Sequence, residues 1–370
     1  MHILFCNWRD TRNPEGGGSE RYVETMARGL AERGHRVTIA CARHDNAPDD
    51  ETVDGVRFVR RGNKLDIYAR TFLAVLLRRY GRVDLVVDVQ NGLPFFTRLA
   101  TRRPVVVLVH HVHREQWPVV YPGRIGRIGW WIESRLAPRL YRRSRYVAVS
   151  EATRVELAEL GVDWSRISIV RNGSDPAPDV DVTRSATPRL CVLGRLVPHK
   201  QVEHAIDVVA ELSADHPDLV LDVVGDGWWS QELRDHARTR GVADRVVFHG
   251  FVDDVAKHEI LAASWAMLLP SLKEGWGIVI GEAGSHGTPS VAYRSAGGTN
   301  ESISHKDSGY LADSQQELTE SVRQILDDHQ WREFLGRGAL DMSRRFSWQT
   351  SQAEFAAVLA DAARDLDHQP

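Results

Sequence analysis

The sequence predicts an α/β protein of two doubly wound domains, each a parallel sheet with helices on both faces. With 370 residues the chain is too long for one ordinary hydrophobic core and suits two cores. Short runs rich in Val, Ile and Leu alternate with longer stretches of helical period, which is the pattern of βα units. The contents of 42% apolar and 26% charged residues indicate a globular chain, not a disordered or fibrous one.

The first domain is expected over residues 1–172. Helices such as Ser19–Arg33 and Glu151–Leu160 alternate with its strands. The expected strands are Ile3–Cys6, Val37–Cys41, Val56–Val59, Leu85–Val89, Val105–His110, Tyr146–Val149 and Ile167–Val170.

A polar stretch with three prolines, residues 173–188, is expected to link the first domain to a second one over residues 189–346. The expected strands of the second domain are Leu190–Leu193, Val220–Val224, Val246–Phe248, Ala266–Leu269 and Ser290–Ala292. Three helical segments follow, at about Gln315–Asp328, Gln330–Phe346 and Trp348–Leu366. We expect residues 347–370 to return and pack on the first domain.

Charge is distributed unevenly along the chain. Residues 1–185 carry 30 basic and 22 acidic side chains, a net +8, whereas the remainder carries 17 and 28, a net −11. The basic part is a candidate for contact with an anionic surface. The chain as a whole has a net charge of −3, which does not favour a nucleic-acid-binding protein.

Cysteine use and hydropathy favour a cytoplasmic protein. Cys6, Cys41 and Cys191 lie in apolar runs, where a thiol behaves as a small buried hydrophobe, so no disulfide framework is indicated. The N-terminal residues are typical of a first strand rather than a signal peptide. No apolar run approaches the ~20 residues that cross a bilayer.

The loop after the first strand holds three adjacent glycines, residues 16–18, just before a helix. Backbone N–H groups there could approach an anion without hindrance from a Cβ atom. The spacing is not the dinucleotide-binding fingerprint. The alternative is a flexible loop that leads into a helix capped by Ser19.

A strand in the first domain ends in His110, His111 and His113. Polar residues at the exit of an apolar strand reach solvent or a ligand. No cysteine or acidic partner supports a structural zinc site. A substrate-facing histidine and ordinary loop histidines are the favoured interpretations, and a metal site is the least favoured.

Two cations follow the first strand of the second domain. Arg195 lies directly after this strand, and Lys200 stands five residues later near the start of a helix. A diphosphate would suit that place, where two cations and helix N–H groups converge. The alternative is a pair of solvated cations.

The segment EGWGIVIGE carries two carboxylates eight positions apart. Glu274 lies in a loop rich in glycine after a strand, and Glu282 lies about one turn inside the following helix. A carboxylate at the loop can accept hydrogen bonds from sugar hydroxyls, and one inside the helix can take a vicinal diol such as ribose. Gly275 and Gly277 let backbone N–H groups turn toward a ligand.

These stretches together resemble family 4 of the retaining, nucleotide-sugar-dependent glycosyltransferases, which have the two-domain GT-B fold. The resemblance covers nearly the whole chain, and the motifs occur in the family's order. They are GGGSE, the strand ending in His, AVSEATRVEL, IVRNGSD, GRLVPHK, VVGDGWW, VVFHGFV, EGWGIVIGE and GGTNESI. The resemblance implies two Rossmann-like domains that face a central cleft.

The resemblance also implies roles for individual residues. His110, with His111 as the alternative, would contact the donor sugar, and Gly17 and Gly18 would face the donor phosphates or the acceptor. Arg195 and Lys200 would hold the diphosphate. The other implied donor contacts are Glu274 on sugar hydroxyls, Glu282 on the ribose, the stretch Gly275, Trp276, Gly277 and Ile278, and Gly250, Phe251 and Val252 beside the base.

The implied reaction is transfer of a hexosyl group from a GDP- or UDP-sugar to a lipid, glycan or small-molecule hydroxyl. Fixed cations facing the leaving phosphate supply the electrostatic stabilisation, so no metal and no further cofactor are expected. Two alternatives remain open, namely a non-hydrolysing sugar-nucleotide epimerase of similar fold and a non-catalytic nucleotide-sugar-binding subunit.

Between Arg124 and Arg145 seven arginines face a single acid, Glu133. A basic amphipathic helix with a tryptophan can lie on an anionic membrane, which favours a peripheral membrane protein. The alternative is a surface helix that packs on its own sheet and is kinked at Pro138. The acceptor-side candidates nearby are His111, His113, Arg114 and Trp117.

Overall fold

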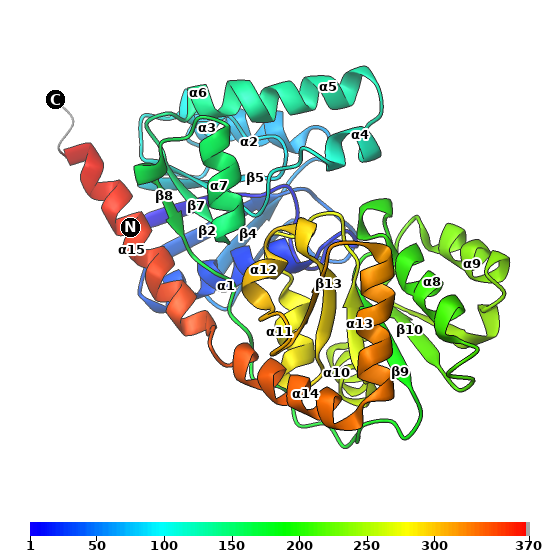
Figure 1. Cartoon of the computed structure of the whole chain (residues 1–370). Coiled ribbons are helices and arrows are strands. Elements are labelled where there is room, and N and C mark those ends of the chain that lie inside the picture. The colour runs from blue at the N-terminus through cyan, green and yellow to red at the C-terminus, as the bar shows by residue number, and fades with distance from the viewer. Residues whose placement is uncertain (368–370) are drawn as a thin grey trace. The chain divides into compact units, whose positions relative to one another are not determined.

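The computed structural model describes the backbone of residues 1–367 and the side chains of residues 1–365 (Figure 1). The chain divides into two compact units. Unit 1 holds Met1–Asn172 together with the chain from Trp348 onward, and unit 2 holds Gly173–Ser347. The final helix therefore belongs to the unit that contains the N-terminus.

Unit 1 is built on a sheet of eight strands in the order β3-β4-β2-β1-β5-β6-β7-β8. Every neighbouring pair is parallel except β3 and β4, which are antiparallel. The strands are β1 (His2–Cys6), β2 (Arg36–Cys41), β3 (Asp50–Val53), β4 (Val56–Arg60), β5 (Leu85–Gln90), β6 (Val105–Val109), β7 (Arg145–Ala148) and β8 (Ile167–Ile169). The inner strands are buried over their whole length, which explains their continuous apolar sequences.

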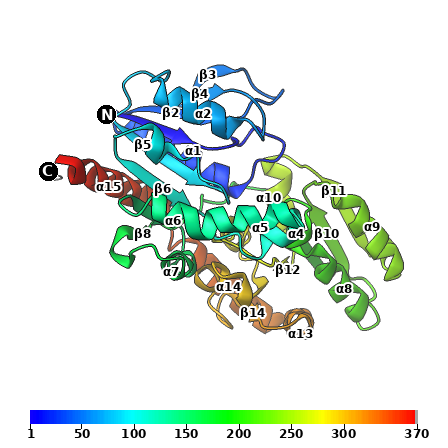
Figure 2. The same ribbon diagram turned by 90° about the horizontal axis from the view of Figure 1, so that it is seen from above.

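The helices of unit 1 connect these strands, and α15 adds to them from the end of the chain. They are α1 (Gly18–Glu32), α2 (Ile67–Leu76), α3 (Thr97–Ala100), α4 (Gln116–Val120), α5 (Arg124–Trp131), a π-helical turn η1 (Ile132–Leu136), α6 (Ala137–Leu140), α7 (Glu151–Glu159), a 3-10 turn η2 (Trp164–Arg166) and α15 (Trp348–Asp367). Figure 2 shows α5 and α6 end to end along one side of the unit.

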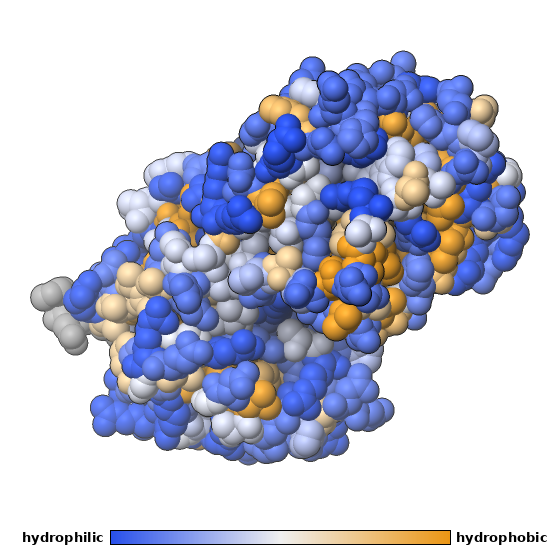
Figure 3. Space-filling view, turned by 90° about the horizontal axis from the view of Figure 1, so that it is seen from below, coloured by the Kyte–Doolittle hydropathy of each residue, from blue (hydrophilic) through white to orange (hydrophobic). Residues whose placement is uncertain are grey.

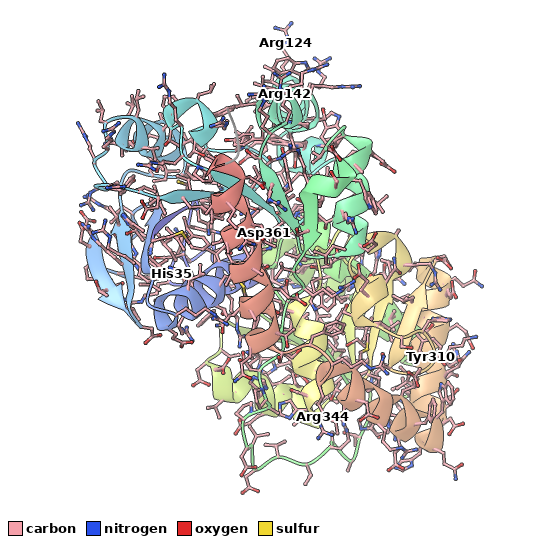
Figure 4. The ribbon with its side chains drawn as sticks, turned by 90° about the vertical axis from the view of Figure 1, so that its left-hand side faces the viewer. His35, Arg124, Arg142, Tyr310, Arg344 and Asp361 are labelled. Atoms are coloured by element: carbon pink, nitrogen blue, oxygen red, sulfur yellow. The ribbon has the colours of Figure 1, made fainter. Side chains whose placement is uncertain are left out.

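Helix α15 packs on unit 1 through aromatic side chains. The buried ring of Phe355 stacks on Phe5 of β1 with ring centroids 6.0 Å apart, and Tyr22 lies edge-on to Phe355 and Trp348. Near its other end, Asp365 accepts hydrogen bonds of 2.8 and 3.2 Å from the Arg145 guanidinium. Figure 4 labels Asp361 on this helix. The expected return of the last helix to the first domain is confirmed.

Unit 2 has six parallel strands in the order β11-β10-β9-β12-β13-β14. The strands are β9 (Arg189–Leu193), β10 (Val220–Val224), β11 (Val246–Gly250), β12 (Ala266–Leu269), β13 (Ser290–Tyr293) and β14 (Gly309–Ala312). The helices and 3-10 turns are η3 (Pro198–Lys200), α8 (Val202–Leu212), α9 (Ser230–Thr239), η4 (Ala243–Arg245), α10 (Asp254–Ala263), α11 (Ile278–Ser285), η5 (Arg294–Ala296), α12 (Thr299–Ser302), α13 (Gln315–Asp327) and α14 (His329–Ser343).

Both sheets have a topological switch point, where the chain stops adding strands on one side and starts on the other. In unit 1 it lies between β1 and β5, and in unit 2 between β9 and β12. Ligands of open α/β sheets bind in the crevice at the carboxyl ends of the strands beside such a point. The loops after β1, β9 and β12 therefore lie where a ligand is expected.

The stretch predicted as a linker is attached to unit 2. The Arg184 guanidinium donates hydrogen bonds to Thr288 Oγ1 (2.6 Å) and to the backbone oxygens of Ser264, His286 and Gly287. Residues 173–188 are thus tied to loops of unit 2 through Arg184, which is itself exposed.

Two strands lie outside the sequence prediction, β3 and β14. The sequence of β3, DETV, is polar and half exposed because this strand forms the outer, antiparallel edge of its sheet. Strand β14 is only four residues long and begins with glycine. The expected Ser19 cap was wrong, because Gly17 is the N-cap of α1 and Ser19 Oγ donates to Glu20 instead.

The face in Figure 3 is dominated by hydrophilic side chains, with apolar side chains in separate patches. Within the described residues, no helix is long and apolar enough to span a membrane.

Candidate functional site

The switch point of unit 2 brings together two of the predicted residues. Lys200 comes from the turn after β9 and Glu274 from the loop after β12, and their Nζ and Oε1 atoms lie 2.5 Å apart. The Leu272 N–H donates to the His199 carbonyl at 2.9 Å, which fixes one loop to the other. A cation and a carboxylate thus lie side by side at the strand ends, each with part of its side chain exposed.

The loop that carries Glu274 is held from behind by a second chain segment. The Glu274 N–H donates to the Ala296 carbonyl at 2.8 Å, and the Gly298 N–H donates to the Glu274 carbonyl at 3.1 Å. A Cβ atom on Gly298 would lie 2.0 Å from the Gly275 oxygen, so the segments approach as closely as glycine allows. This close contact explains why the GGTNESI motif begins with glycines.

Helix α11 begins at this loop and carries Glu282. Gly277 is its N-cap with a φ of +83°, a conformation that favours glycine, and Ile278 is its first residue. The buried Glu282 Oε1 lies 3.0 Å from Lys257 Nζ on α10. A carboxylate one turn into the helix therefore has a cation beside it.

Other predicted donor residues of unit 2 lie in different surroundings. The Trp276 side chain is 4% exposed and packs edge-on against Phe346 at 4.8 Å, so this indole points into the interior. Arg195 is half-buried in the loop after β9. Gly250 ends the edge strand β11 with a φ of +67°, and the Phe251 side chain that follows is 89% exposed, with Val252 half-buried beyond it.

In unit 1, His110 follows β6 and is 5% exposed. Burial lowers the pKa of His110 to about 4, so its imidazole is neutral at physiological pH. The rings of His110 and Tyr22 form an edge-to-face pair with centroids 5.3 Å apart. The His110 carbonyl accepts a hydrogen bond of 3.0 Å from Thr153 Oγ1. The buried Nε2 atom has no hydrogen-bond partner among the described residues, which suits an atom that meets a ligand.

The glycine loop after β1 is a compact, hydrogen-bonded turn. The Gly16 N–H donates to the Asn13 carbonyl at 2.7 Å, and the Gly17 N–H donates to Glu20 Oε2 at 2.8 Å. The Gly17 N–H is thus engaged by a carboxylate and not open to an anion, contrary to the expectation for that group. Gly18 is the first residue of α1.

Sequence reasoning missed the charged residues that hold this loop. The buried Glu20 pairs with Arg9 Nε at 2.9 Å. The buried Asp10 accepts from Arg60 Nε (2.5 Å) and from His44 Nε2 (2.8 Å). The signal in the sequence was a pair of charged residues, Arg9 and Asp10, three and four residues after the apolar strand β1.

The acceptor-side candidates fall into two groups. His111 and His113 have ring centroids 4.2 Å apart, and Trp117 is linked to His113 through the buried Glu133. The Arg114 side chain pairs instead with Glu159 of α7 at 3.5 Å and is 47% exposed. Within the described residues no three His, Cys, Asp or Glu side chains cluster as metal ligands, and metal independence stays a prediction.

Comparison with known proteins follows the same division of the chain. The family model "Glycosyltransferase Family 4" matches residues 16–177, and "Glycosyl transferases group 1" matches residues 179–341. The chain therefore belongs to the family 4, group 1 glycosyltransferases.

Relatives cover almost the whole chain. It is 25% identical to glycogen synthase of Mycobacterium tuberculosis over 398 residues, covering 98% of this chain and 95% of that protein. It is 27% identical to the GDP-mannose-dependent alpha-(1-6)-phosphatidylinositol monomannoside mannosyltransferase of the same organism, covering 95% and 97%.

Solved structures share the fold. Sucrose-phosphate synthase from Thermosynechococcus elongatus matches with a TM-score of 0.81 and 17% identity over 97% of this chain and 98% of that one. Anabaena HepE, solved with UDP and glucose, matches with a TM-score of 0.74 and 21% identity over 98% and 100%. The fold is GT-B, as the resemblance implied.

Proposed function

We propose that the protein transfers a hexosyl group from a nucleotide diphosphate sugar to a hydroxyl acceptor, with retention of the anomeric configuration and without a metal ion. The observation that carries this proposal is the Lys200–Glu274 pair at the switch point of unit 2. A cation for the diphosphate and a carboxylate for sugar hydroxyls lie there within one hydrogen bond.

The chemistry follows from where charge develops. As the bond between the anomeric carbon and the phosphate oxygen breaks, negative charge grows on the leaving diphosphate and positive charge on the sugar ring. Arg195 and Lys200 stabilise the leaving group, which is the kind of preorganised electrostatics that contributes most to enzyme rates. We assign no covalent nucleophile.

The other residues bind and orient the substrates in this proposal. Glu274 accepts hydrogen bonds from sugar hydroxyls, and Glu282 accepts them from the ribose. The neutral His110 offers its unpartnered Nε2 to the donor sugar. Unit 2 binds the nucleotide part of the donor, and the strand ends of unit 1 supply His110 and bind the acceptor.

The proposal does not specify which nucleotide sugar is the donor or which hydroxyl compound is the acceptor, so the test compares several of each. We expect either UDP or GDP, but not both equally, to raise the melting temperature, because binding to the folded state alone stabilises it by RT ln(1 + [L]/Kd). The protein is then incubated with UDP-glucose or GDP-mannose, and with glycogen, phosphatidylinositol monomannoside vesicles or water as acceptor. These probes are chosen from the names of the two relatives, glycogen synthase and the GDP-mannose-dependent phosphatidylinositol monomannoside mannosyltransferase.

The one-bond coupling between the anomeric carbon and its proton, read by NMR on the product, reports retention or inversion for glucose and mannose alike. A sugar changed at C2 without transfer would indicate the epimerase, and nucleotide binding with no turnover would indicate a non-catalytic subunit. An inverted product would overturn the proposed stereochemistry while leaving the glycosyltransferase assignment intact.

We also propose that the enzyme works on an anionic membrane, docked through α5. Helix α5 exposes Ile125 (68%), Ile128 (59%) and Trp131 (54%) beside its arginines. Arg124, Arg127, Ile128 and Trp131 line a depression of about 360 Å³, and Figure 4 shows Arg124 projecting outward from the ribbon. Arginines for lipid headgroups and apolar tips for the acyl boundary suit such a surface.

A further inference from the structure

The segment from Arg124 to Leu140 buries an unusual face. Its apolar residues Ile128 and Trp131 are exposed, whereas the buried residues are Gly126, Gly129, Glu133, Ser134, Ala137 and Pro138, none of them with a large apolar side chain. Glu133, the single acid of this basic segment, is 0% exposed. A buried carboxylate is costly unless hydrogen bonds satisfy it, so its partners define what it does.

Three nitrogen atoms converge on the Glu133 carboxylate. Oε1 lies 3.2 Å from the backbone nitrogen of His113 and 3.0 Å from its Nδ1, and Oε2 lies 2.6 Å from Trp117 Nε1. An ionised carboxylate only accepts hydrogen bonds, and two oxygens are needed to serve groups on two sides. An aspartate is too short to replace it, and a glutamine has only one accepting oxygen.

This geometry fixes the tautomer of His113. Because Glu133 only accepts, the His113 Nδ1 atom carries the proton, and the neutral ring has its lone pair on Nε2. The neighbouring His111 has its own Nε2 engaged by Gln116 Oε1 at 3.0 Å. His113 Nε2 is therefore the atom of this pair suited to receive a hydrogen bond from a ligand.

The Trp117 ring is wedged so that this arrangement is rigid. A Cβ atom on Gly129 would lie 2.3 Å from the Trp117 ring, and one on Gly92 would lie 2.9 Å from it. Gly129 of α5 comes nearest to Cζ3 of the ring, and Gly92 of the loop after β5 comes nearest to Cζ2. The indole N–H that Glu133 accepts thus has a fixed position.

The π-helical turn η1 lies where this carboxylate enters the interior. Glu133 is the second residue of the turn. Pro138 lies two residues after the last residue of the turn, and it has no N–H group to donate to the Ser134 carbonyl. A π-turn relieves such a mismatch, and turns of this kind are frequent at functional sites.

We propose that Glu133 is a positioning residue of the acceptor side: it holds His113 as the Nδ1–H tautomer, so that His113 Nε2 accepts a hydrogen bond from the acceptor hydroxyl. The part concerning the acceptor rests on the proposed transfer function. The part concerning the tautomer does not, and the two are tested separately.

The tautomer is tested on the full chain labelled with 15N-histidine, at pH 8.5, where an ordinary imidazole is neutral. The His113 signals are assigned by their loss in His113→Gln. We expect two-bond 15N–1H spectra to show His113 as Nδ1–H in the parent protein. In Glu133→Gln the Trp117 indole takes the single carbonyl oxygen, so the amide NH2 faces His113 Nδ1, and we expect the Nε2–H form.

Glu159→Gln is the matched control, since Glu159 is an exposed carboxylate of α7 that pairs with Arg114, the residue next to His113. It should leave the His113 tautomer as it is. An Nε2–H form in the parent protein, or an Nδ1–H form retained in Glu133→Gln, overturns the proposal. Unfolding of Glu133→Gln would be seen in the same spectra, and the parent tautomer would still decide the point.

The functional arm measures KM separately for each substrate in the transfer assay. Glu133→Gln should raise the KM for the hydroxyl acceptor about three- to tenfold, as expected for one misplaced hydrogen bond, and change the KM for the donor less than twofold. Equal changes in both values would indicate a structural role only. Absence of any transfer in the parent protein would sink the proposed function but leave the tautomer result standing.

Discussion

At the scale of single residues, the cation at the switch point of unit 2 gives the sharpest prediction. We expect Lys200→Ala to lower kcat by about 10²- to 10³-fold, because one preorganised group that stabilises developing charge contributes on this order. Initial rates with saturating donor measure it. Glu274 would also lose its 2.5 Å partner, so the KM for the donor should change as well.

Arg337→Ala serves as the control, because this exposed arginine of α14 lies in the same unit. It should leave kcat within twofold of the parent value. A Lys200→Ala enzyme with unchanged kcat would refute the assignment of Lys200 to the leaving group.

His110 makes a prediction about stability and pH. Burial lowers the pKa of His110 to about 4, below the 6.5 of an unfolded chain, so protons bind preferentially to the unfolded state between these values. This group's contribution is complete above pH 6.5 and falls by about 2 kcal/mol at pH 5. Urea unfolding at pH 7.5 and 5.0 should therefore show a smaller loss in His110→Gln than in the parent protein.

His286, whose pKa burial also lowers to about 4, retains its own share of the loss in both proteins. An equal loss in parent and variant would mean that His110 is protonated in the folded state.

The sequence predicted functional residues in the loops and turns that follow apolar strands, and it missed residues whose role depends on a partner far along the chain. Lys200 and Glu274 follow strands that adjoin at the switch point, so their meeting could be expected from topology. Glu133 lies 20 residues from His113 in a helix that read as a basic surface, and nothing in its sequence neighbourhood marks it as buried.

At the scale of elements, the glycines of α5 determine how this helix packs. We expect Gly129→Ala to destabilise unit 1 by about 1–3 kcal/mol, because the new Cβ atom would lie 2.3 Å from the wedged Trp117 ring. Urea denaturation followed by tryptophan fluorescence measures it. Ile125→Ala, an exposed change in the same helix, should alter the unfolding free energy by less than about 0.5 kcal/mol.

The exposed face of the same helix carries the membrane prediction. The protein should cosediment with vesicles of anionic phospholipid at low salt and much less with neutral ones, and binding should fall as salt rises. Ile128→Asp with Trp131→Ala should reduce this binding at least fivefold. Phe334→Ala, which removes an exposed aromatic ring of unit 2, is the control and should bind as the parent does. Equal binding to neutral and anionic vesicles would contradict the proposal.

Strands and helices could be predicted where the pattern of apolar residues reflects which side chains are buried, and less well where it does not. The twelve expected strands all occur, with ends shifted by at most two residues, because buried parallel strands have continuous apolar sequences. Strand β3 is polar at a sheet edge. Helix α5 has an apolar stripe that faces outward, because glycines occupy its buried face, so apolar periodicity indicates the wrong side of this helix.

At the scale of the whole molecule, the charge asymmetry follows the compact units. Unit 1 has 30 basic and 23 acidic side chains, a net +7, and unit 2 has 17 and 27, a net −10. The segment Arg124–Arg145, which supplies seven of the basic residues, includes the proposed membrane surface. In this proposal the basic unit binds the acceptor, whereas the donor cations belong to the acidic unit.

The last helix gives a prediction for the whole chain. Phe355→Ala should destabilise unit 1 by about 3–5 kcal/mol, since a fully buried ring that stacks on Phe5 is removed. The shift in melting temperature that a nucleotide causes should remain, because the residues proposed to bind the diphosphate and the ribose, Arg195, Lys200 and Glu282, lie in unit 2. Hydrogen exchange that increases equally in both units would contradict this separation.

The assignment of α15 to unit 1 also bears on biosynthesis. Because residues 1–172 lack their final helix until residue 348 and beyond have left the ribosome, unit 2 is synthesised in full while unit 1 is still incomplete. The Tyr22 and Phe5 surface that Phe355 later covers stays exposed during that interval. A chain released early, even by the last twenty residues, would thus contain every proposed donor-binding residue and still be a substrate for chaperones and proteases.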